Sequence, residues 1–352
     1  MKYQSPPQLT MFLGVALAIL MGCGTPATIP TATSPTPATS QPRAIVIDTD
    51  MAADDWMAIL YLLQRQDMMV RAITVTGIGE THCAPGIRHA LGLEALSGYD
   101  KILVACGRET PLQGNHAFPD SWREDVDKLL GLTLPESQDT ATNLTAVELL
   151  ASVVQSSPVK VTLLTLGPLT NIAEALQNNP ALVDNIERIY IMGGAVNVPG
   201  NVGASGVGIN NNTAEWNFYV DPHAANVVLQ SNASIVLVPL DATNQVPLNS
   251  KFYNRLKSHH TSSEATFVFD VLTNRKAFID SGGYFFWDPL AAAILTDESL
   301  ATFQTKNLCV VETEGPESGW TKSGNGCPEV RVAASADGRR FEQIFLDTLN
   351  TP

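Results

Sequence analysis

Acidic residues concentrate in one short segment of this chain. Asp48, Asp50, Asp54 and Asp55 fall within eight residues, directly after the apolar run 44–47. One aspartate at the start of a helix is usually a cap, but four clustered carboxylates repel one another. A bound hard cation with oxygen ligands offsets that repulsion. The segment therefore predicts a divalent metal site, with a solvated acidic turn as the alternative.

Four later motifs also follow an apolar run or open a helix. They occupy residues 166–171 (Leu-Gly-Pro-Leu-Thr-Asn), 192–194 (Met-Gly-Gly), 214–217 (Ala-Glu-Trp-Asn) and 287–289 (Trp-Asp-Pro). Taken singly, each is a weak signal, because such turns are common. The paired glycines in 192–194 permit a close approach of the backbone, so that loop is a candidate binding segment.

The elements that must position these motifs alternate along the chain. Short apolar runs predict strands at 44–47, 70–75, 102–104, 159–164, 186–192 and 234–238. Helical patterning predicts helices at 54–65, 84–97, 145–155, 171–177 and 222–230. This alternation predicts an α/β fold with an open, mainly parallel sheet, mixed at its edge, and helices on both faces. Ligands of such sheets bind beyond the carboxyl ends of the strands, where the motifs fall.

The charge of the chain limits its partners. There are 35 acidic and 21 basic residues among 352, a formal net charge of −14. We expect no nucleic-acid polymer as partner, because a phosphate backbone requires a basic face. Electrostatic binding to anionic lipid is disfavoured for the same reason. Metal cations and small neutral or cationic solutes remain. The length suits one large α/β domain over residues 43–352.

The N-terminal segment has the character of an export signal. An apolar run at 11–21 is short for a membrane span and suits a signal peptide. Its last two residues and the two that follow, 20–23, read Leu-Met-Gly-Cys, which resembles a bacterial lipobox ending at Cys23. We predict a signal peptide at 1–22, lipidation of Cys23 and a Pro/Thr/Ser-rich tether at 23–42. The chain would then be exported and face the periplasm or cell exterior, held to the membrane by its lipid alone. A plain secretory signal or a short buried helix is the alternative.

Export permits disulfides. The cysteines Cys83, Cys106, Cys309 and Cys327 allow three pairings. A turn-rich segment separates the last two and favours a local bridge between them. None of the four has the spacing of zinc ligands.

Taken together and in order, the motifs resemble those of the nucleoside hydrolase family, of the inosine–uridine-preferring type and its relatives. The family's Asp-x-Asp-Pro-Gly-x-Asp-Asp motif stands at 48–55 with Met51 and Ala52 in place of Pro-Gly. Its Gly-Pro-Leu-Thr-Asn turn is intact at 167–171, and its Ala-Glu-Phe-Asn motif has Trp216 for Phe. The resemblance runs from about residue 43 to 349 and implies a Rossmann-like nucleoside hydrolase fold.

The resemblance implies Ca²⁺-dependent hydrolysis of the N-glycosidic bond of ribonucleosides. It gives as metal ligands Asp50, Asp55, Asp288 and the backbone carbonyl of Leu166. Asp50 would be the general base. Asp54, the second catalytic residue, would bind the ribose 2′-hydroxyl. The transition state would resemble an oxocarbenium ion, which carboxylates stabilise.

Further substrate contacts follow from the same resemblance. Asn201, Glu215 and Asn217 would hold the 3′- and 5′-hydroxyls, and Met192 belongs to the binding set. The loop before Glu215 is longer than in typical members, so an asparagine of the 202–213 insert is an alternative to Asn201. Asp48 would support the metal ligands.

Two substitutions and one loop bear on the contacts to the ribose and to the leaving base. Trp287 stands where this family type has a histidine, which favours a purine or another aromatic base, with simple packing as the alternative. Glu80 replaces an asparagine or aspartate, and its extra methylene shifts any ribose contact. His116 and Trp122, after the third strand, are candidate base contacts.

Two other functions compete with hydrolysis. One is a lipid-anchored, Ca²⁺-dependent nucleoside or ribose receptor without turnover. The other is a phosphatase of the haloacid dehalogenase type, whose Asp-x-Asp signature is present but which the paired Asp54 and Asp55 fit badly. Family members are often oligomers, so a homo-oligomer stays open.

Overall fold

The central element is a nine-stranded sheet within the described residues 41–99 and 101–351 of the computed structural model. Its strands are β1 (Arg43–Thr49), β2 (Met68–Val75), β3 (Leu103–Cys106), β4 (Val161–Thr165), β5 (Ile186–Met192), β6 (Ile235–Val238), β7 (Ala301–Val310), β8 (Thr321–Ser323) and β9 (Glu329–Ala336). Their spatial order is β3-β2-β1-β4-β5-β6-β9-β7-β8. The sheet is parallel from β3 to β9, and β7 and β8 add an antiparallel edge. The predicted fold class, including the mixed edge, is confirmed.

The helices lie between and beyond these strands. They are α1 (Ala53–Leu63), α2 (Cys83–Leu96), α3 (Asp120–Asp127), α4 (Ala146–Ser156), α5 (Thr170–Asn178), α6 (Trp216–Val220), α7 (Pro222–Leu229), α8 (Leu240–Thr243), α9 (Ser250–Ser258), α10 (Ser263–Asn274), α11 (Lys276–Asp280), α12 (Trp287–Thr296) and α13 (Gly338–Leu349). Short 3₁₀ turns occur at Leu129–Gly131, Pro180–Asn185, Gly203–Ser205 and Glu298–Leu300. The predicted strands and helices are all present, with ends shifted by at most two residues. A helix was also expected to open at 287–289, where α12 begins, whereas β7, β8, β9, α3, α6, α8 to α11 and α13 were not predicted.

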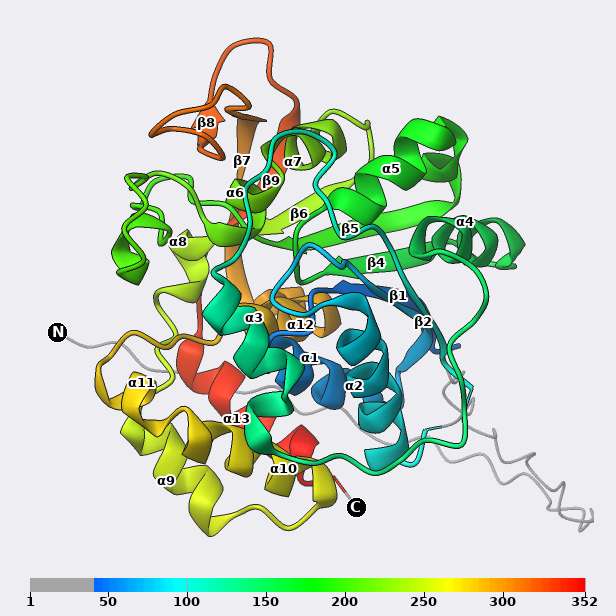
Figure 1. Ribbon diagram of the computed structural model, residues 1–352, viewed down its shortest axis with the longest axis vertical. Helices are drawn as coiled ribbons and strands as arrows, with labels where there is room; N and C mark the ends of the chain where they lie inside the picture. Colours follow the sequence, from blue (N-terminus) through cyan, green and yellow to red (C-terminus); the bar gives the residue numbers. More distant parts are fainter. Residues whose placement is uncertain (1–40, 100, 352) are drawn as a thin grey trace, which may run out of the picture. The chain divides into compact units, whose positions relative to one another are not determined.

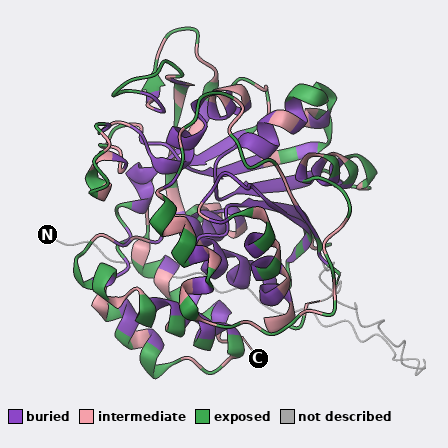
Figure 2. Cartoon of the chain, viewed as in Figure 1, coloured by how far each residue is buried: buried purple, intermediate pink, exposed green. Residues whose placement is uncertain are grey.

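Both faces of the sheet are covered. Ile45 and Ile47 of β1 belong to one core cluster, whereas Val46 between them belongs to another. Figure 1 shows α4, α5 and α7 on one side of the sheet and α1, α12 and α13 on the other. Figure 2 shows the sheet buried and the outward helix faces exposed. This two-sided burial explains why the central strands are continuous apolar runs.

Two disulfides resolve the pairing of the cysteines. One joins Cys83 at the start of α2 to Cys106 at the end of β3. The other joins Cys309 of β7 to Cys327, just beyond β8. The predicted local bridge is therefore present.

The predicted signal peptide, Cys23 and almost the whole tether lie outside the described residues, so they stay predictions. Within the described part of the chain, no helix is both long and apolar enough to span a bilayer.

The placement of α13 in the core can be tested by removing one ring. Phe345 is fully buried and contacts Tyr61 and Phe341. We expect Phe345→Ala to lower the free energy of unfolding by about 3–5 kcal/mol. The control Leu144→Ala, at an exposed position, should change it by no more than about 0.5 kcal/mol. Urea unfolding measures both, and equal effects would contradict this packing.

Candidate metal centre

The acidic segment forms the turn between β1 and α1. Asp48 and Thr49 end the strand, and Ala53 begins the helix. Met51, between them, is buried with a φ of 59°, the left-handed region that disfavours side chains. Its backbone N–H donates to Thr49 Oγ1 at 3.0 Å. The turn is therefore held in a strained shape, which directs several carboxylates to one place.

Three carboxylates from two helices converge beside this turn. Asp54 and Asp55 lie in the first turn of α1, and Asp288 lies in the first turn of α12, which packs against α1. One oxygen of each lies within 4.8 Å of the other two. Both helices present their N-terminal ends to the carboxylates, an arrangement that favours negative charge.

This cluster fits a hard divalent cation. Burial and the neighbouring carboxylates raise the pKa of Asp55 and Asp288 well above the usual range. Asp55 Oδ2 and Asp288 Oδ1 are buried and have no hydrogen-bond partner. Buried polar atoms without partners are costly, and a cation at this point would satisfy them.

Asp50 is positioned by backbone groups around it. Its Oδ1 accepts the N–H of Ala52 at 3.2 Å, and its Oδ2 accepts the N–H of Glu80 at 3.3 Å. A Cβ at Gly79 would lie 1.9 Å from Asp50 Cβ, and one at Gly167 would lie 2.6 Å from it. Only glycines permit these two loops to close on Asp50.

Asp50 also belongs to the cluster electrostatically. Its backbone N–H donates to Asp55 Oδ1 at 3.2 Å. Burial raises the pKa of Asp50 to about 6, although the backbone donors and the nearby Arg123 oppose the rise. The carboxylate repels Asp54, whose own pKa rises to about 7 through loss of surrounding water and this repulsion.

Asp48 is a supporting carboxylate. It lies opposite Thr74 in the parallel register of β1 and β2, and Thr74 Oγ1 donates to Asp48 Oδ1 at 2.5 Å. Asn171 Nδ2 donates to the same oxygen at 2.8 Å. Burial raises the pKa of Asp48 to about 7 despite these donors. Asn171 thus links the turn after β4 to the acidic segment.

The motif around Glu215 adjoins the turns after β4 and β5. Glu215 caps α6, and Oε2 also accepts the Gly194 N–H at 2.9 Å. Asn217 Nδ2 donates to the carbonyl of Leu166 at 3.1 Å and to that of Met192 at 3.2 Å. Asn217 therefore contacts three other predicted site residues, Leu166, Met192 and Glu215.

Glu80 is partly exposed and lies within electrostatic reach of Asp50 and Asp54. Loss of surrounding water raises its pKa to about 8, and the charges of Asp50 and Asp54 add to the rise. Arg275, at the end of α10, opposes it. The sequence offers no signal for Arg275, because no motif surrounds it.

A cluster of aromatic rings surrounds Trp287 at the start of α12. Trp287 contacts Phe278, Tyr284 and Phe285 at ring-centroid distances of 6.5, 5.6 and 5.9 Å. Its Nε1 is buried and has no hydrogen-bond partner. Trp287 directly precedes Asp288, so α12 contributes to the aromatic cluster and the carboxylate cluster with adjacent residues.

The remaining predicted residues contact other loops. His116 is held at both ring nitrogens, by the carbonyl of Tyr219 at 2.8 Å and by Glu314 at 3.0 Å. Trp122 packs on Trp216 at 5.3 Å, and Asn201 Oδ1 accepts the N–H of Trp216 at 3.2 Å. The three residues therefore contact Tyr219 or Trp216 of α6, and none of these contacts is with the clustered carboxylates.

Hydrogen bonds of Asn211 hold the 202–213 insert in place. Asn211 is buried, and its Oδ1 accepts the N–H groups of Thr213 and Ala214. Its Nδ2 donates to the carbonyl of Ser318 at 2.7 Å, in the segment between β7 and β8. Asn211 therefore supports the loop, and the choice between Asn201 and an asparagine of the 202–213 insert as a substrate contact stays a prediction.

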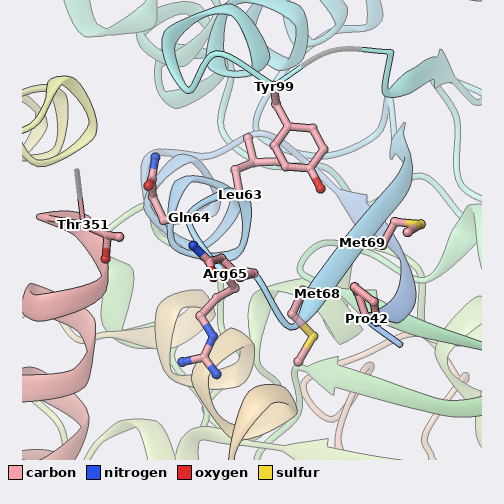
Figure 3. Close-up of a pocket in the computed structure, with 9 residues that line it drawn as sticks. Pro42, Leu63, Gln64, Arg65, Met68, Met69, Tyr99 and Thr351 are labelled. Carbon is pink, nitrogen blue, oxygen red and sulfur yellow. The ribbon is translucent and has the colours of Figure 1, made fainter. Parts of the chain in front are cut away.

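A second hollow lies at the opposite ends of the strands. Figure 3 shows Pro42, Leu63, Met68 and Tyr99 around it, next to the start of β1 and β2. Arg65, which also lines it, pairs with neighbouring Asp67 at 2.7 Å. No group of carboxylates or other catalytic side chains lines this hollow, so the metal centre is the candidate site.

Similar proteins are known for most of the described chain. A family model for the inosine-uridine preferring nucleoside hydrolases matches residues 45–343. A probable uridine nucleosidase 1 of Oryza sativa subsp. japonica is 30% identical over 286 residues, or 80% of this chain and 85% of the relative. A pyrimidine-specific ribonucleoside hydrolase of Escherichia coli O1:K1 / APEC is 35% identical over 214 residues, or 61% of this chain and 65% of the relative. A solved purine-preferring ribonucleoside hydrolase from Gardnerella vaginalis is 26% identical, with a TM-score of 0.76 and coverage of 88% of this chain and 98% of that one.

The glycine at position 79 gives a test of the metal centre. Gly79→Ala places a methyl group where Asp50 lies, so we expect affinity for a divalent cation to fall about 10- to 100-fold. Gly324→Ala is the matched control, because its Cβ would meet only Cys327 Sγ at 3.4 Å. Calorimetric titration measures both. Unchanged affinity in Gly79→Ala would remove Asp50 from the centre.

The raised pKa values predict an unusual pH dependence. Asp48, Asp54 and Glu215 have pKa values of about 7 in the folded, metal-free chain. Unfolded carboxyls ionise near about pH 4. Between about pH 6.5 and 8 the folded chain therefore binds more protons, and its stability falls as pH rises.

A cation requires ionised ligands, so its binding should weaken or remove this fall. Melting temperatures at the two pH values, with chelator and with added divalent cation, measure the difference. A metal-free protein that becomes more stable toward pH 8 would contradict the prediction.

Proposed function

The chain belongs to the inosine-uridine preferring nucleoside hydrolase family, whose members are metal-dependent N-glycosyl hydrolases of ribonucleosides, and from this premise we propose that its metal is Ca²⁺ and its preferred substrates are purine nucleosides. The observation that carries the metal assignment is the convergence of Asp54, Asp55 and Asp288, in which Asp55 Oδ2 and Asp288 Oδ1 are buried without a hydrogen-bond partner. All the donors are hard oxygens, which suit Ca²⁺ better than softer metals.

The proposed ligands are Asp50, Asp55, Asp288 and the Leu166 carbonyl. Leu166 fits this role because its neighbour Gly167 closes on Asp50. Bound there, the metal would supply a water of lowered pKa and a fixed position for the ribose hydroxyls.

The side chains around the metal divide the remaining work. Asp50 accepts the proton of the attacking water, because backbone donors fix its carboxylate at the cluster. Asp54, partly exposed, binds the 2′-hydroxyl. Glu215 and Asn217 bind the other hydroxyls from the far side of the Leu166 turn. The negative charge of Asp50, Asp54 and Glu215 stabilises the positive sugar of an oxocarbenium-like transition state.

The preference for purines rests on the aromatic cluster at Trp287. Tyr284 of this cluster contacts Trp287 and lies close enough to Asp54 and Asp288 for their charges to raise its pKa. A large flat base gains more from stacking than a small one. Relatives of both kinds exist: the rice protein is named for uridine and the Gardnerella structure for purines.

We also propose that the chain is exported and anchored through a lipid at Cys23. The disulfides Cys83–Cys106 and Cys309–Cys327 support export, because such bridges persist in oxidising compartments.

The proposed reaction is tested by ribose release. Adenosine, guanosine, inosine, uridine and cytidine are incubated with the protein in Ca²⁺ or in chelator. We expect Ca²⁺-dependent release, reduced about 10²- to 10⁴-fold by Asp50→Asn. Asp347→Asn, an exposed carboxylate on α13, is the control. Binding without release would favour a receptor, and equal release in chelator would reject the metal assignment.

Base preference is measured in the same assay. Trp287→Leu should lower the purine-to-pyrimidine ratio of kcat/KM by about 3- to 10-fold, through loss of stacking. Phe303→Leu, an aromatic residue of β7 outside this cluster, is the control. A ratio that Trp287→Leu leaves unchanged would assign the ring to packing.

A further inference from the structure

The bridge between Cys83 and Cys106 joins two loops at the catalytic edge of the sheet. Cys83 begins α2, directly after the loop 76–82 that follows β2. Cys106 ends β3, directly before the loop that begins at Gly107. Both cysteines are partly exposed. The bridge therefore joins the loops that follow β2 and β3, two neighbouring parallel strands, at the carboxyl ends of those strands.

The first of these loops holds Asp50. The N–H of Glu80 donates to Asp50 Oδ2, and Thr81 donates to the Asp50 carbonyl from its N–H at 3.1 Å and its Oγ1 at 2.6 Å. Thr81 is two residues from Cys83. A displacement of the start of α2 would move these donors.

The second loop holds Asp48 through Asn171. A Cβ at Gly107 would lie 1.9 Å from Asn171 Oδ1, so the backbone after Cys106 presses directly on that amide. Asn171 Nδ2 donates to Asp48 Oδ1 at 2.8 Å. Cys106 thus neighbours the support of Asp48, as Cys83 neighbours the support of Asp50.

A further set of contacts ties the two loops together near the bridge. Glu109 Oε1 accepts the N–H of Cys83 at 2.9 Å. A Cβ at Gly77 would meet both Cys83 Sγ and Glu109 Cγ at 2.8 Å. Arg123 donates to the Gly77 carbonyl at 2.7 Å. The bridge is the covalent member of this contact region.

We propose that Cys83 and Cys106 are positioning residues: their disulfide fixes the loops that hold Asp50 and Asp48, and so sets metal affinity and turnover. This inference rests on the proposed function for turnover, but its metal-binding and loop-order consequences do not. Loss of the bridge lets loop 76–82 move away from Asp50, while Glu215, Asn217 and the Trp287 cluster stay in place.

The second disulfide provides a matched control. Cys309–Cys327 has a sequence separation of 18 residues, and Cys83–Cys106 one of 23. Their effects on the entropy of the unfolded chain are therefore similar. Cys309–Cys327 closes the β7–β8 hairpin, and none of the hydrogen bonds to Asp48 or Asp50 among the described residues comes from that hairpin.

The experiment compares Cys83→Ser/Cys106→Ser with Cys309→Ser/Cys327→Ser in the full chain. We expect both to lower the melting temperature. Only the first should weaken Ca²⁺ binding, by about 10- to 100-fold, and lower kcat with little change in KM. Only the first should speed hydrogen exchange in peptides that span 77–82.

Equal changes of Ca²⁺ affinity in both variants, or a change of melting temperature alone in the first, would overturn the proposal. If the wild-type chain releases no ribose, the proposed function is rejected, and the Ca²⁺ affinities of the two variants still test the role of the Cys83–Cys106 bridge. If the wild-type chain binds no Ca²⁺, the rate of hydrogen exchange in 77–82 tests that role.

A second measurement guards against misfolding of the first variant. The folded Cys309→Ser/Cys327→Ser protein is treated with a phosphine, which reduces the Cys83–Cys106 disulfide. The phosphine is oxidised to its oxide with the oxygen of a water molecule, and the two hydrogens of that water protonate the Cys83 and Cys106 thiols. Ca²⁺ affinity should fall on reduction and return on reoxidation. Affinity that reduction leaves unchanged would overturn the proposal.

Discussion

The constraint on which the rest of this structure depends is the burial of several like-charged carboxylates at one edge of a parallel sheet. Asp48, Asp50, Asp55 and Asp288 are each at most 2% exposed. Removal from water penalises their charge, and mutual repulsion adds to the penalty. Hydroxyl, amide and backbone donors satisfy some of their oxygens, and the helix N-termini favour the rest. Those donors leave three buried oxygens without partners, Asp48 Oδ2, Asp55 Oδ2 and Asp288 Oδ1, and a cation beside Asp55 and Asp288 would satisfy the last two.

Close approach of the backbone is the second requirement. The loops after β2 and β4 reach Asp50 only because Gly79 and Gly167 have no Cβ. The loop after β3 reaches Asn171 in the same manner at Gly107. Three connections from different strands thus meet on one acidic segment, and the position of each depends on the others. A fault in one loop is therefore transmitted to the carboxylates without any direct contact with the metal.

The sequence predicted the parts of this arrangement that are local. β1 to β6 were recognisable because each is buried on both faces and reads as an apolar run. β7 was not, because exposed and buried residues are mixed along it at the sheet edge. The carboxylates of 48–55 were visible from their density alone. Thr81 and Arg275 were not, because their relation to Asp50 and Asp54 exists only after the loop after β2 and the end of α10 have folded against α1.

The first turn of α12 brings the carboxylate cluster and the aromatic cluster next to each other. Trp287 contributes to the aromatic cluster and Asp288 to the carboxylate cluster, and one peptide bond separates them. α12 packs on α1, which carries Asp54 and Asp55, so the two helices cannot shift independently. If the carboxylates hold the ribose and Trp287 the base, as proposed, the packed pair of α1 and α12 would set the distance between them. Because the glycosidic bond joins those two parts of the substrate, the packing of α12 on α1 would then orient the bond that the proposed reaction breaks.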